Sequence, residues 1–556
     1  MQNTSEAQAA PLSVHDAPRR LQPSRVAVFV ILLALLIFFG LVRYRLRDMP
    51  LERDEGEYAY SGQLMLEGIP PYQLAYNMKL PGIYAAYAAI MAVLGETPTG
   101  IHLGLLLLNA ATIVVMYFLA ARLFGRLAGV IAACSYAVLS ASSSVMGFQA
   151  HATNFVVLPA LIGVLLLLRG MDSNNAWALF VGGVSSGIAV LMKQHGIFFV
   201  LFCMLYLWFE PARKSKDARF TARRIAIYVA GVAVPYAITC LWLLKAGVFP
   251  QFWFWTVSYA GEYSKMGLRR GIHAFLENSS TVVAPAVAIW ILAAIGFSAM
   301  CWSAGARRYS RLMALLLLCS FLSTCPGVFF RPHYFVLVLP VIAILVGVAV
   351  SAAEEWLAAK PKLLRFRFVP IAIFMLALAS TVFAQRRDYF VRSPLQVLES
   401  TYPNDPFEAT MAVADYVKAN SMDADRIAVL GSEPEIYFYA RRRSATGHIY
   451  MYGLIVRHKY TATMREQFER ELEKNRPEFL VYIDVRNSWG EREGAVQAAP
   501  FLDWTRQFMS AGYERVGMAD LASTTNYVWG NSAATYVPRS SNVIYVLRRV
   551  PSASTQ

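Results

Sequence analysis

The stretch VAVFVILLALLIFFGLV, residues 26–42, decides the fold, because no charged or strongly polar side chain interrupts it. Three arginines, Arg19, Arg20 and Arg25, precede it, and it lacks the small-residue ending at which a signal peptide is cleaved. We therefore predict an uncleaved membrane-spanning helix that leaves residues 1–25 as a cytoplasmic tail.

Similar apolar blocks recur up to residue 385. The 556 residues are 57% hydrophobic and only 16% charged, whereas a soluble chain carries roughly a quarter charged residues. Blocks of about 17–25 residues fit a hydrocarbon core of ~30 Å. We predict a polytopic α-helical membrane domain over residues 26–385 with about eleven to thirteen spanning helices. The candidate spans are 26–44, 100–121, 128–147, 154–169, 176–192, 196–210, 225–244, 282–302, 311–329, 334–351 and 369–385.

The net charge of +15 comes largely from short connections between these blocks. Basic residues in short loops favour the cytoplasmic side, so the charge indicates orientation and contact with anionic membrane lipid, and no nucleic-acid partner is predicted. The cytoplasmic connections are then 122–126, 169–175, 211–224, 304–311 and 352–367. Four arginines depart from this rule because they would lie outside, after the first span: Arg43, Arg45, Arg47 and Arg53.

Two segments would lie on the outer side of the membrane. The first external loop, 45–99, contains the helical patterns 58–66 and 82–94, which we expect at the membrane interface. From Arg386 the composition becomes that of a soluble domain. Helices at 405–420 and 463–475 alternate with strands, which predicts a periplasmic or extracellular α/β domain over residues 386–556. The expected strands are 426–430, 479–484, 513–517 and 542–548.

Ionisable residues gather at the outer ends of the spans, although they are far apart in sequence. Ionisable groups near membrane depth are costly and tend to be functional; the alternative is that each is a solvated loop residue. The set comprises Asp54, Glu55, Glu57, Lys79, His151, Lys193, His195, Arg331 and His333, with Tyr58, Asn154 and Tyr334 beside them.

Several short motifs in this set occur in a familiar order. Asp54-Glu55-Gly56-Glu57-Tyr58-Ala59-Tyr60 is followed by Met65-Leu66-Glu67-Gly68 and by Lys79-Leu80-Pro81-Gly82. Later come residues 122–126, Met192-Lys193 and Arg331-Pro332-His333-Tyr334. Over residues 26–385 this series resembles the GT-C glycosyltransferases, and among them the aminoarabinose transferase and protein mannosyltransferase family. Leu80, Gln194 and His195 depart from the family pattern.

The resemblance implies an integral-membrane enzyme that takes a sugar from a polyprenyl-phosphate donor and passes it to an acceptor lipid, glycan or protein. It implies a multi-pass protein of the bacterial inner membrane with its site on the periplasmic side. Asp54 is the implied catalytic base, with Glu55 as the alternative. Lys79, Lys193, Arg331 and His333 would hold the donor phosphate. Substrate contacts are expected from Glu57, Tyr58, His151, Asn154, His195 and Tyr334.

Other interpretations stay open at this stage. A transporter or flippase for lipid-linked sugars would place charges at the bilayer midplane and contain an internal repeat, and the sequence has neither. A membrane-anchored binding protein would use the C-terminal domain. No cofactor is required; a divalent metal could be held if Asp54, Glu55, His151 and His333 converge, although the sequence has no metal-binding motif. The aromatic run 252–263 is either an interfacial belt or a sugar platform.

Overall fold

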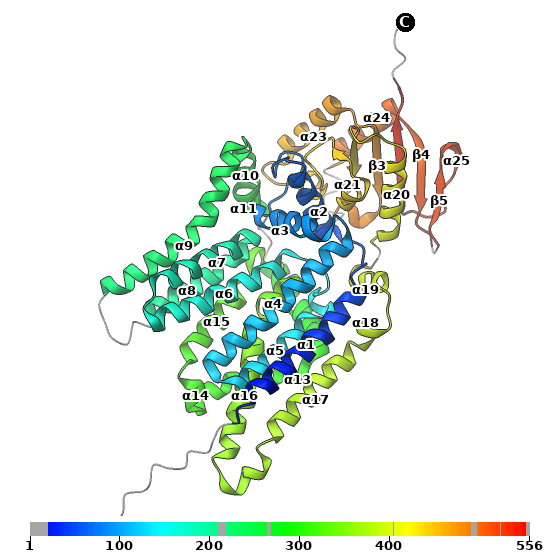
Figure 1. Cartoon of the computed structure of the whole chain (residues 1–556). Coiled ribbons are helices and arrows are strands. Elements are labelled where there is room, and N and C mark those ends of the chain that lie inside the picture. Colours follow the sequence, from blue (N-terminus) through cyan, green and yellow to red (C-terminus); the bar gives the residue numbers. More distant parts are fainter. Residues whose placement is uncertain are drawn as a thin grey trace, which may run out of the picture.

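The computed structural model describes residues 21–209, 218–263, 268–403, 405–490, 498–522 and 524–551. It consists of a long helical bundle with a mixed α/β domain at one end (Figure 1). The predicted fold class, a polytopic membrane domain followed by a C-terminal α/β domain, is confirmed. Most of the predicted cytoplasmic tail, and the predicted loop residues 211–217, lie outside the described residues.

Each predicted span overlaps a helix of the bundle, although the spans 128–147, 311–329 and 334–351 also include short 3-10 turns at their ends. Within the described part of the chain, seven helical segments are long and apolar enough to cross a membrane, and further apolar helices are shorter. The bundle helices are α1 (Arg25–Arg45), α4 (Pro98–Phe124), α5 (Arg126–Ser140), α6 (Ala152–Ser173), α7 (Ala176–Met192), α8 (Ile197–Phe209), α9 (Ala218–Lys245), α12 (Leu268–Val283) with α13 (Val287–Trp302), α15 (Ser310–Leu322), α16 (Leu339–Ala358) and α17 (Val369–Ala384).

The centre of the bundle is α16, whose side chains are buried on nearly every face. It packs against α5 and α13, and a side chain at Gly296 of α13 would meet the Leu345 carbonyl of α16. Small residues permit such close approach between membrane helices. In contrast, α1 and α17 expose large apolar side chains such as Phe29 and Leu376. These helices form the face that meets lipid.

The described residues of the predicted cytoplasmic connections lie toward the end of the bundle that is remote from the α/β domain (Figure 1). The amide of Arg126, between α4 and α5, donates to Gln22 at 2.9 Å, and Arg122 pairs with Asp172 at the end of α6. Arg224 of α9 reaches the Met171 carbonyl at 3.1 Å. These contacts place the basic residues of the predicted cytoplasmic connections together at one end of the bundle.

The arginines that broke the charge rule have structural partners. Arg43 donates to the carbonyls of Gly147 and Ser140 at 2.8 and 3.0 Å. Arg45 donates to carbonyls in and beside α18 (Arg386–Phe390), including Tyr389 at 2.8 Å. These two guanidinium groups bind the end of α1 to neighbouring segments. Because their hydrogen bonds stabilise the fold, the positions of Arg43 and Arg45 do not indicate on which side of the membrane this end of α1 lies.

The first loop forms two helices beneath the α/β domain, α2 (Arg53–Leu66) and α3 (Pro81–Leu94) (Figure 1). They pack on each other, and α3 also contacts α4 and α7. The helical patterns expected at 58–66 and 82–94 are thus confirmed as helices. Because α2 starts five residues earlier than expected, Asp54 lies in its first turn.

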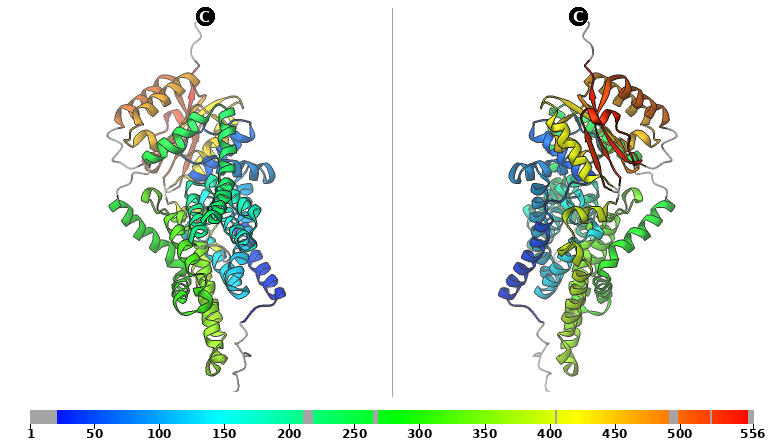
Figure 2. Two further views of the ribbon diagram at one scale, coloured as in Figure 1. Left: turned by 90° about the vertical axis from the view of Figure 1, so that its left-hand side faces the viewer. Right: turned by 90° about the vertical axis from the view of Figure 1, so that its right-hand side faces the viewer.

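The α/β domain contains one six-stranded sheet in the order β2-β1-β3-β6-β4-β5. The pairs β2–β1 and β1–β3 are parallel, and the others are antiparallel. Helices cover both faces of the sheet (Figure 2). The strands are β1 (Arg426–Leu430), β2 (Arg443–Ser444), β3 (Phe479–Asp484), β4 (Tyr513–Asp520), β5 (Asn526–Trp529) and β6 (Val543–Arg549), and the helices α20 (Phe407–Ala419), α21 (Glu435–Ala440), α22 (Tyr452–Ile455), α23 (Thr461–Asn475), α24 (Ala499–Gly512) and α25 (Asn531–Thr535).

The segment that follows the predicted boundary at 386 lies against the bundle before the helices and strands of the sheet begin at α20. The preceding helices, α18 and α19 (Pro394–Thr401), pack against the end of the bundle. Ser143 donates to Asp388 at 2.8 Å, and Tyr402 lies 2.9 Å from the His151 ring. Residues 386–402 therefore extend the bundle toward the site described below.

Candidate active site

A cavity of about 260 Å³ lies where the bundle, the first loop and the α/β domain meet. Its walls come from all three parts of the chain. One end is charged and the other is aromatic. The lining includes Asp54, Tyr76, Lys79, Lys193, His195, Trp255, Tyr259, Tyr263, Arg331, Tyr334, His448, Tyr450 and Tyr452.

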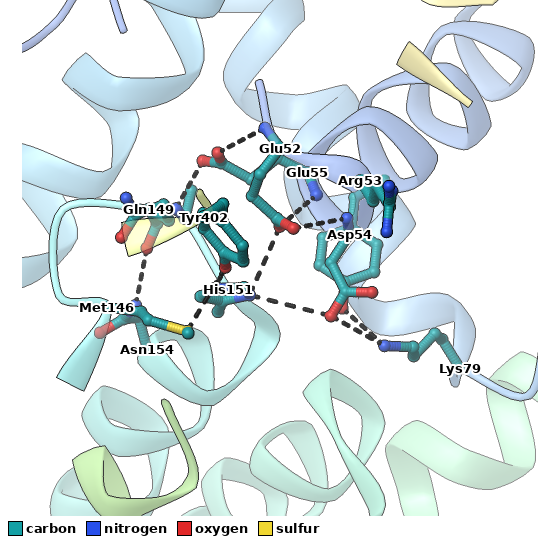
Figure 3. Close-up of polar contacts among 12 residues, drawn as sticks. Glu52, Arg53, Asp54, Glu55, Lys79, Met146, Gln149, His151, Asn154 and Tyr402 are labelled. Carbon is teal, nitrogen blue, oxygen red and sulfur yellow. Dashed lines mark hydrogen bonds and ion pairs between the residues drawn. The ribbon is translucent and has the colours of Figure 1, made fainter. Parts of the chain in front are cut away.

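Asp54 is placed in the cavity by the way α2 begins. Glu52 caps the helix, accepting from the amides of Asp54 and Glu55 at 2.9 and 2.8 Å. Because Glu52 already accepts hydrogen bonds from the free amides at the start of the helix, the Asp54 carboxylate is not used as a cap. Its Oδ2 lies 3.3 Å from Lys79 Nζ. From the other side, His151 Nδ1 lies 3.8 Å away (Figure 3).

Positive charge dominates the surroundings of this carboxylate. Burial by itself raises the pKa of Asp54, but the charges of Lys79, His151, Arg331 and Lys193 outweigh burial and hold the pKa below its usual range. Asp54 is therefore ionised throughout the physiological pH range. An ionised carboxylate at the helix N-terminus is also favoured by the helix dipole.

Three cations surround the charged end of the cavity: Lys79, Lys193 and Arg331. Besides Asp54, Lys79 contacts the Tyr58 hydroxyl at 3.0 Å. Lys193 is buried over the Tyr334 ring, and Arg331 donates to the Tyr263 hydroxyl at 3.2 Å.

Lys193 and Arg331 have no carboxylate within ion-pair distance in the described part of the chain. Lys193 is 6% exposed, and a buried cation without a counter-ion is costly. Arg331 is exposed and adds positive charge at the mouth of the same cavity. The site is therefore built for an anionic ligand.

Two histidines stack beside Asp54. The rings of His151 and His333 are 4.2 Å apart and nearly parallel, and His333 Nδ1 is buried without a hydrogen-bond partner. One ligand atom from each of Asp54, His151 and His333 lies within 4.8 Å of the others. Imidazole and carboxylate are zinc ligands, so the donor types suit a divalent metal, which would supply Lewis-acid stabilisation of phosphate there.

The charges around this cluster oppose a resident metal, because three cations already face Asp54. We expect the sugar-transfer activity that the sequence resemblance implies to stay within about twofold when the purified protein is dialysed against a chelator. The measurement compares chelated protein with and without added Zn²⁺ or Mg²⁺. A loss greater than tenfold that only the added metal restores would show that a metal occupies the cluster.

The remaining predicted residues lie around the cavity in different roles. His195 Nδ1 contacts the Ser323 carbonyl at 2.7 Å, and its ring meets Tyr334 edge-on, so both line the cavity in fixed orientations. Glu55 points away from the cavity, bound to His102 at 3.0 Å and to the Ala150 amide at 2.6 Å. We infer that Glu55 anchors α2 and that only Asp54 remains as the candidate base.

Asn154 and Glu57 are buried beside the site without lining the cavity. Asn154 donates to the Gln149 carbonyl at 3.0 Å. Glu57 accepts from Asn77 at 2.8 Å and from Tyr84 at 2.6 Å. Burial raises the pKa of Glu57 to about 8, although Lys79 lowers it and Asp54 raises it further. Glu57 is therefore mainly protonated at neutral pH.

We expect stability to depend on pH through Glu57. Its pKa is about 8 in the folded protein and about 4.3 in an unfolded chain. The folded state thus holds one more proton, and the free energy of unfolding falls as pH rises toward 8. Glu57→Gln mimics the protonated form and should not lose stability in this range. Thermal unfolding of both proteins between pH 5 and 9 measures the difference, with Glu67→Gln at the exposed end of α2 as the control. Parallel curves for wild type and Glu57→Gln would contradict this prediction.

Most of the aromatic residues that line the other end of the cavity were not predicted from the sequence. The segment Phe254–Tyr259 is a π-helix, a rare form that is frequent at functional sites. Its wider turn brings Trp255 and Tyr259 together, with ring centroids 5.0 Å apart, and Tyr76 stacks on Trp255. Trp253 in the same run is 49% exposed. Trp253 thus faces outward whereas Trp255 lines the cavity, and the two interpretations of the aromatic run stay predictions.

The α/β domain supplies the rest of the aromatic wall through His448, Tyr450 and Tyr452. The ring of His448 meets Tyr76 and Trp255 edge-on. No sequence signal distinguished these residues, because a single sequence does not show which loop of a domain meets the bundle. The α/β domain is thus part of the site.

Comparisons with known proteins agree with this geometry. Residues 79–242 match the family model of the dolichyl-phosphate-mannose-protein mannosyltransferases. No curated protein sequence matches the chain. Among solved structures, ArnT from Cupriavidus metallidurans bound to undecaprenyl phosphate is 16% identical with a TM-score of 0.59, covering 95% of this chain and 99% of ArnT.

Two further structures share the fold. The Archaeoglobus fulgidus oligosaccharyltransferase in complex with zinc and sulfate is 15% identical, with a TM-score of 0.53 over 89% of this chain and 73% of that protein. The mycobacterial arabinofuranosyltransferase AftD is 12% identical, with a TM-score of 0.51 over 95% of this chain and 40% of AftD. The chain therefore has the fold of the membrane protein ArnT, and residues 79–242 match the protein mannosyltransferase family model.

Proposed function

We propose that this protein transfers a sugar from a polyprenyl-phosphate donor to an acceptor bound in the cavity beneath the α/β domain. One observation carries the proposal: an ionised Asp54 faces Lys79, Lys193 and Arg331, and the last two lack an acidic partner within the described residues. A phosphodiester supplies the missing negative charge. The family match favours transfer over flipping of a lipid-linked sugar.

The reaction follows from these charges. The acceptor hydroxyl attacks the anomeric carbon, its oxygen forms the new glycosidic bond, and Asp54 takes its proton. The bond between that carbon and the phosphate oxygen breaks, and the polyprenyl phosphate leaves with the electron pair. Lys79, Lys193 and Arg331 stabilise the charge that develops on the phosphate. Bound phosphate also compensates these cations, so the pKa of Asp54 rises toward its usual range and the carboxylate becomes a stronger base.

The two ends of the cavity suggest how the substrates lie. The phosphate belongs at the charged end, with the polyprenyl chain along the apolar helices of the bundle. The aromatic end offers the rings of Tyr76, Trp255 and Tyr259 to the apolar face of a sugar. His195 and Tyr334 lie between the two ends in our assignment, and His333 and His151 support Asp54 from behind.

We place the protein in a bacterial inner membrane, with the cavity and the α/β domain on the periplasmic side. Support comes from the basic connections, which gather at the opposite end of the bundle as cytoplasmic loops do. The acceptor is an envelope lipid, glycan or protein that reaches the cavity from this side.

A direct assay tests the proposed function. Purified protein is incubated with short-chain polyprenyl-phosphate sugars and with extracted envelope acceptors, and labelled product is measured. Mass spectrometry of envelope glycans from a strain without the chain then identifies the acceptor. We expect one glycan modification to disappear and to return with the wild-type chain. Movement of lipid-linked sugar across proteoliposomes without glycosyl transfer would overturn the proposal in favour of a flippase.

A further inference from the structure

The α/β domain contacts the residues on both sides of Asp54 through hydrogen bonds, ion pairs and close packing. The side chain of Arg53 turns away from the cavity, and its Nη2 lies 3.1 Å from Asp405 and 3.0 Å from Glu433. Its Nη1 donates to the Tyr452 hydroxyl at 2.6 Å and to the Asn487 carbonyl at 3.1 Å. One arginine, adjacent in sequence to the proposed base, therefore makes four polar contacts beyond the bundle.

The backbone around Asp54 is held as well. The Tyr450 hydroxyl donates to the carbonyl of Arg53 at 2.8 Å, and the amide of Leu51 donates to the Tyr439 hydroxyl at 2.9 Å. On the next turn of α2, a side chain at Gly56 would come within 2.6–2.8 Å of Glu435, including its backbone. Only glycine allows α2 and α21 to approach this closely.

The partners of Arg53 are themselves fixed. Glu433 is 1% exposed as a side chain and accepts a hydrogen bond from Ser488 at 2.5 Å. Ser488 also holds the backbone, since its hydroxyl accepts from the Ser432 amide at 2.8 Å. A buried ion pair of this kind adds little net stability, but it fixes orientation, because breaking one side leaves a charge uncompensated.

We propose that Arg53 is a positioning residue, through which Glu433 of the α/β domain and Asp405, just before α20, set the first turn of α2 and hence the place of the Asp54 carboxylate. The α/β domain thereby acts in the transfer step itself. This inference rests on the proposed function, in which Asp54 is the base. The donor phosphate is held by residues outside this contact, so it depends less on Arg53. A misplacement of about 1 Å in a catalytic geometry can cost on the order of 100-fold in rate.

Glu433→Gln and Arg53→Lys test the inference in the full-length protein, since each keeps size while removing a charge or the forked geometry. We expect kcat to fall about 10- to 100-fold. The KM for a polyprenyl-phosphate sugar, and the thermal shift produced by undecaprenyl phosphate, should stay within about threefold of wild type. Asp405→Asn, at the less buried partner, should have a smaller effect in the same direction. If Glu433→Gln does not fold, the kcat of Asp405→Asn is measured in its place.

The matched control is Arg443→Gln. Arg443 pairs with Glu67 at 3.0 Å, so it also joins the α/β domain to α2, but at the far end of the helix and in an exposed position. We expect wild-type kcat for this variant. Equal losses in Arg443→Gln and Glu433→Gln would overturn the inference, because any weakening of the contact would then suffice.

Coupling to Asp54 separates positioning from general damage. In an Asp54→Asn background, adding Glu433→Gln should change the residual rate less than twofold, since its effect passes through the Asp54 carboxylate. A further tenfold loss would contradict the inference. If Asp54→Asn itself keeps full activity, Asp54 is not the base and the positioning role fails with it, whereas the proposed function fails only if the wild-type protein transfers no sugar. If Asp54→Asn is inactive while Glu433→Gln and Arg53→Lys keep wild-type kcat, only the positioning role fails.

Discussion

Asp54→Asn should lower kcat by about 100- to 10,000-fold, the range that general base catalysis contributes. Asparagine keeps the size of the side chain and cannot take a proton from the acceptor hydroxyl. Because the carboxylate also faces Lys79 at 3.3 Å, its loss leaves the three cations without an anion. We therefore expect undecaprenyl phosphate to bind the variant at least as tightly as wild type. The measurements are single-turnover transfer and the thermal shift on adding undecaprenyl phosphate.

Glu55→Gln is the comparison for this experiment. Glu55 is an adjacent carboxylate in the same turn but faces His102 and the Ala150 amide. It should reduce stability more than it reduces the rate of transfer in protein that remains folded. Full activity of Asp54→Asn would remove Asp54 from the mechanism. Loss of activity only in Glu55→Gln would exchange the two roles.

Lys193→Met should change activity and stability in opposite directions. In the described part of the chain Lys193 has no acidic partner, and its buried ammonium contacts the Tyr334 ring close to two other cations. Replacing such a charge with an apolar side chain of similar volume removes an uncompensated desolvation cost, so we expect the variant to be at least as stable. Removing one donor that stabilises developing charge typically costs about 100- to 1,000-fold in kcat.

We therefore expect Lys193→Met to unfold at a higher temperature without ligand, to gain less from added undecaprenyl phosphate, and to transfer sugar at least about 100-fold more slowly. Thermal unfolding with and without undecaprenyl phosphate, together with the transfer assay, gives all three quantities. Lys193→Arg, which keeps the charge, is the control and should retain part of the activity. A Lys193→Met protein that is both less stable and fully active would show that Lys193 supports the fold and does not hold phosphate.

Local sequence patterns were sufficient for most secondary structure. Apolar blocks located the bundle helices because a bilayer requires a fixed length of apolar helix. In the α/β domain the expected strands 426–430 and 479–484 match β1 and β3 residue for residue, since buried strands are short apolar runs. The sequence did not show β2 or β5, which have two and four residues. Strands this short pair only because the rest of the sheet is already in place.

For the site, the sequence likewise located several residues but did not show how their side chains are oriented. The sequence placed Asp54, Lys79, Lys193 and Arg331 at one end of the bundle, because ionisable residues between apolar blocks stand out and because the resemblance ordered them. It could not separate Asp54 from Glu55, since neighbouring residues on a helix point in directions about 100° apart and only packing shows which one meets the cavity.

Among the arginines that follow the first span, Arg53 shows most clearly which contacts the sequence alone could not predict. By itself the sequence determined a polytopic membrane fold with charged residues at one end, because hydrophobic length and the placement of basic loops depend on local composition. Only the tertiary structure decided that Arg53 joins α2 to the α/β domain, that His448, Tyr450 and Tyr452 form a wall of the cavity, and that Lys193 and Arg331 face it without acidic partners in the described residues. Each of these contacts joins segments more than a hundred residues apart, and such pairings are set by how the helices and the sheet pack together.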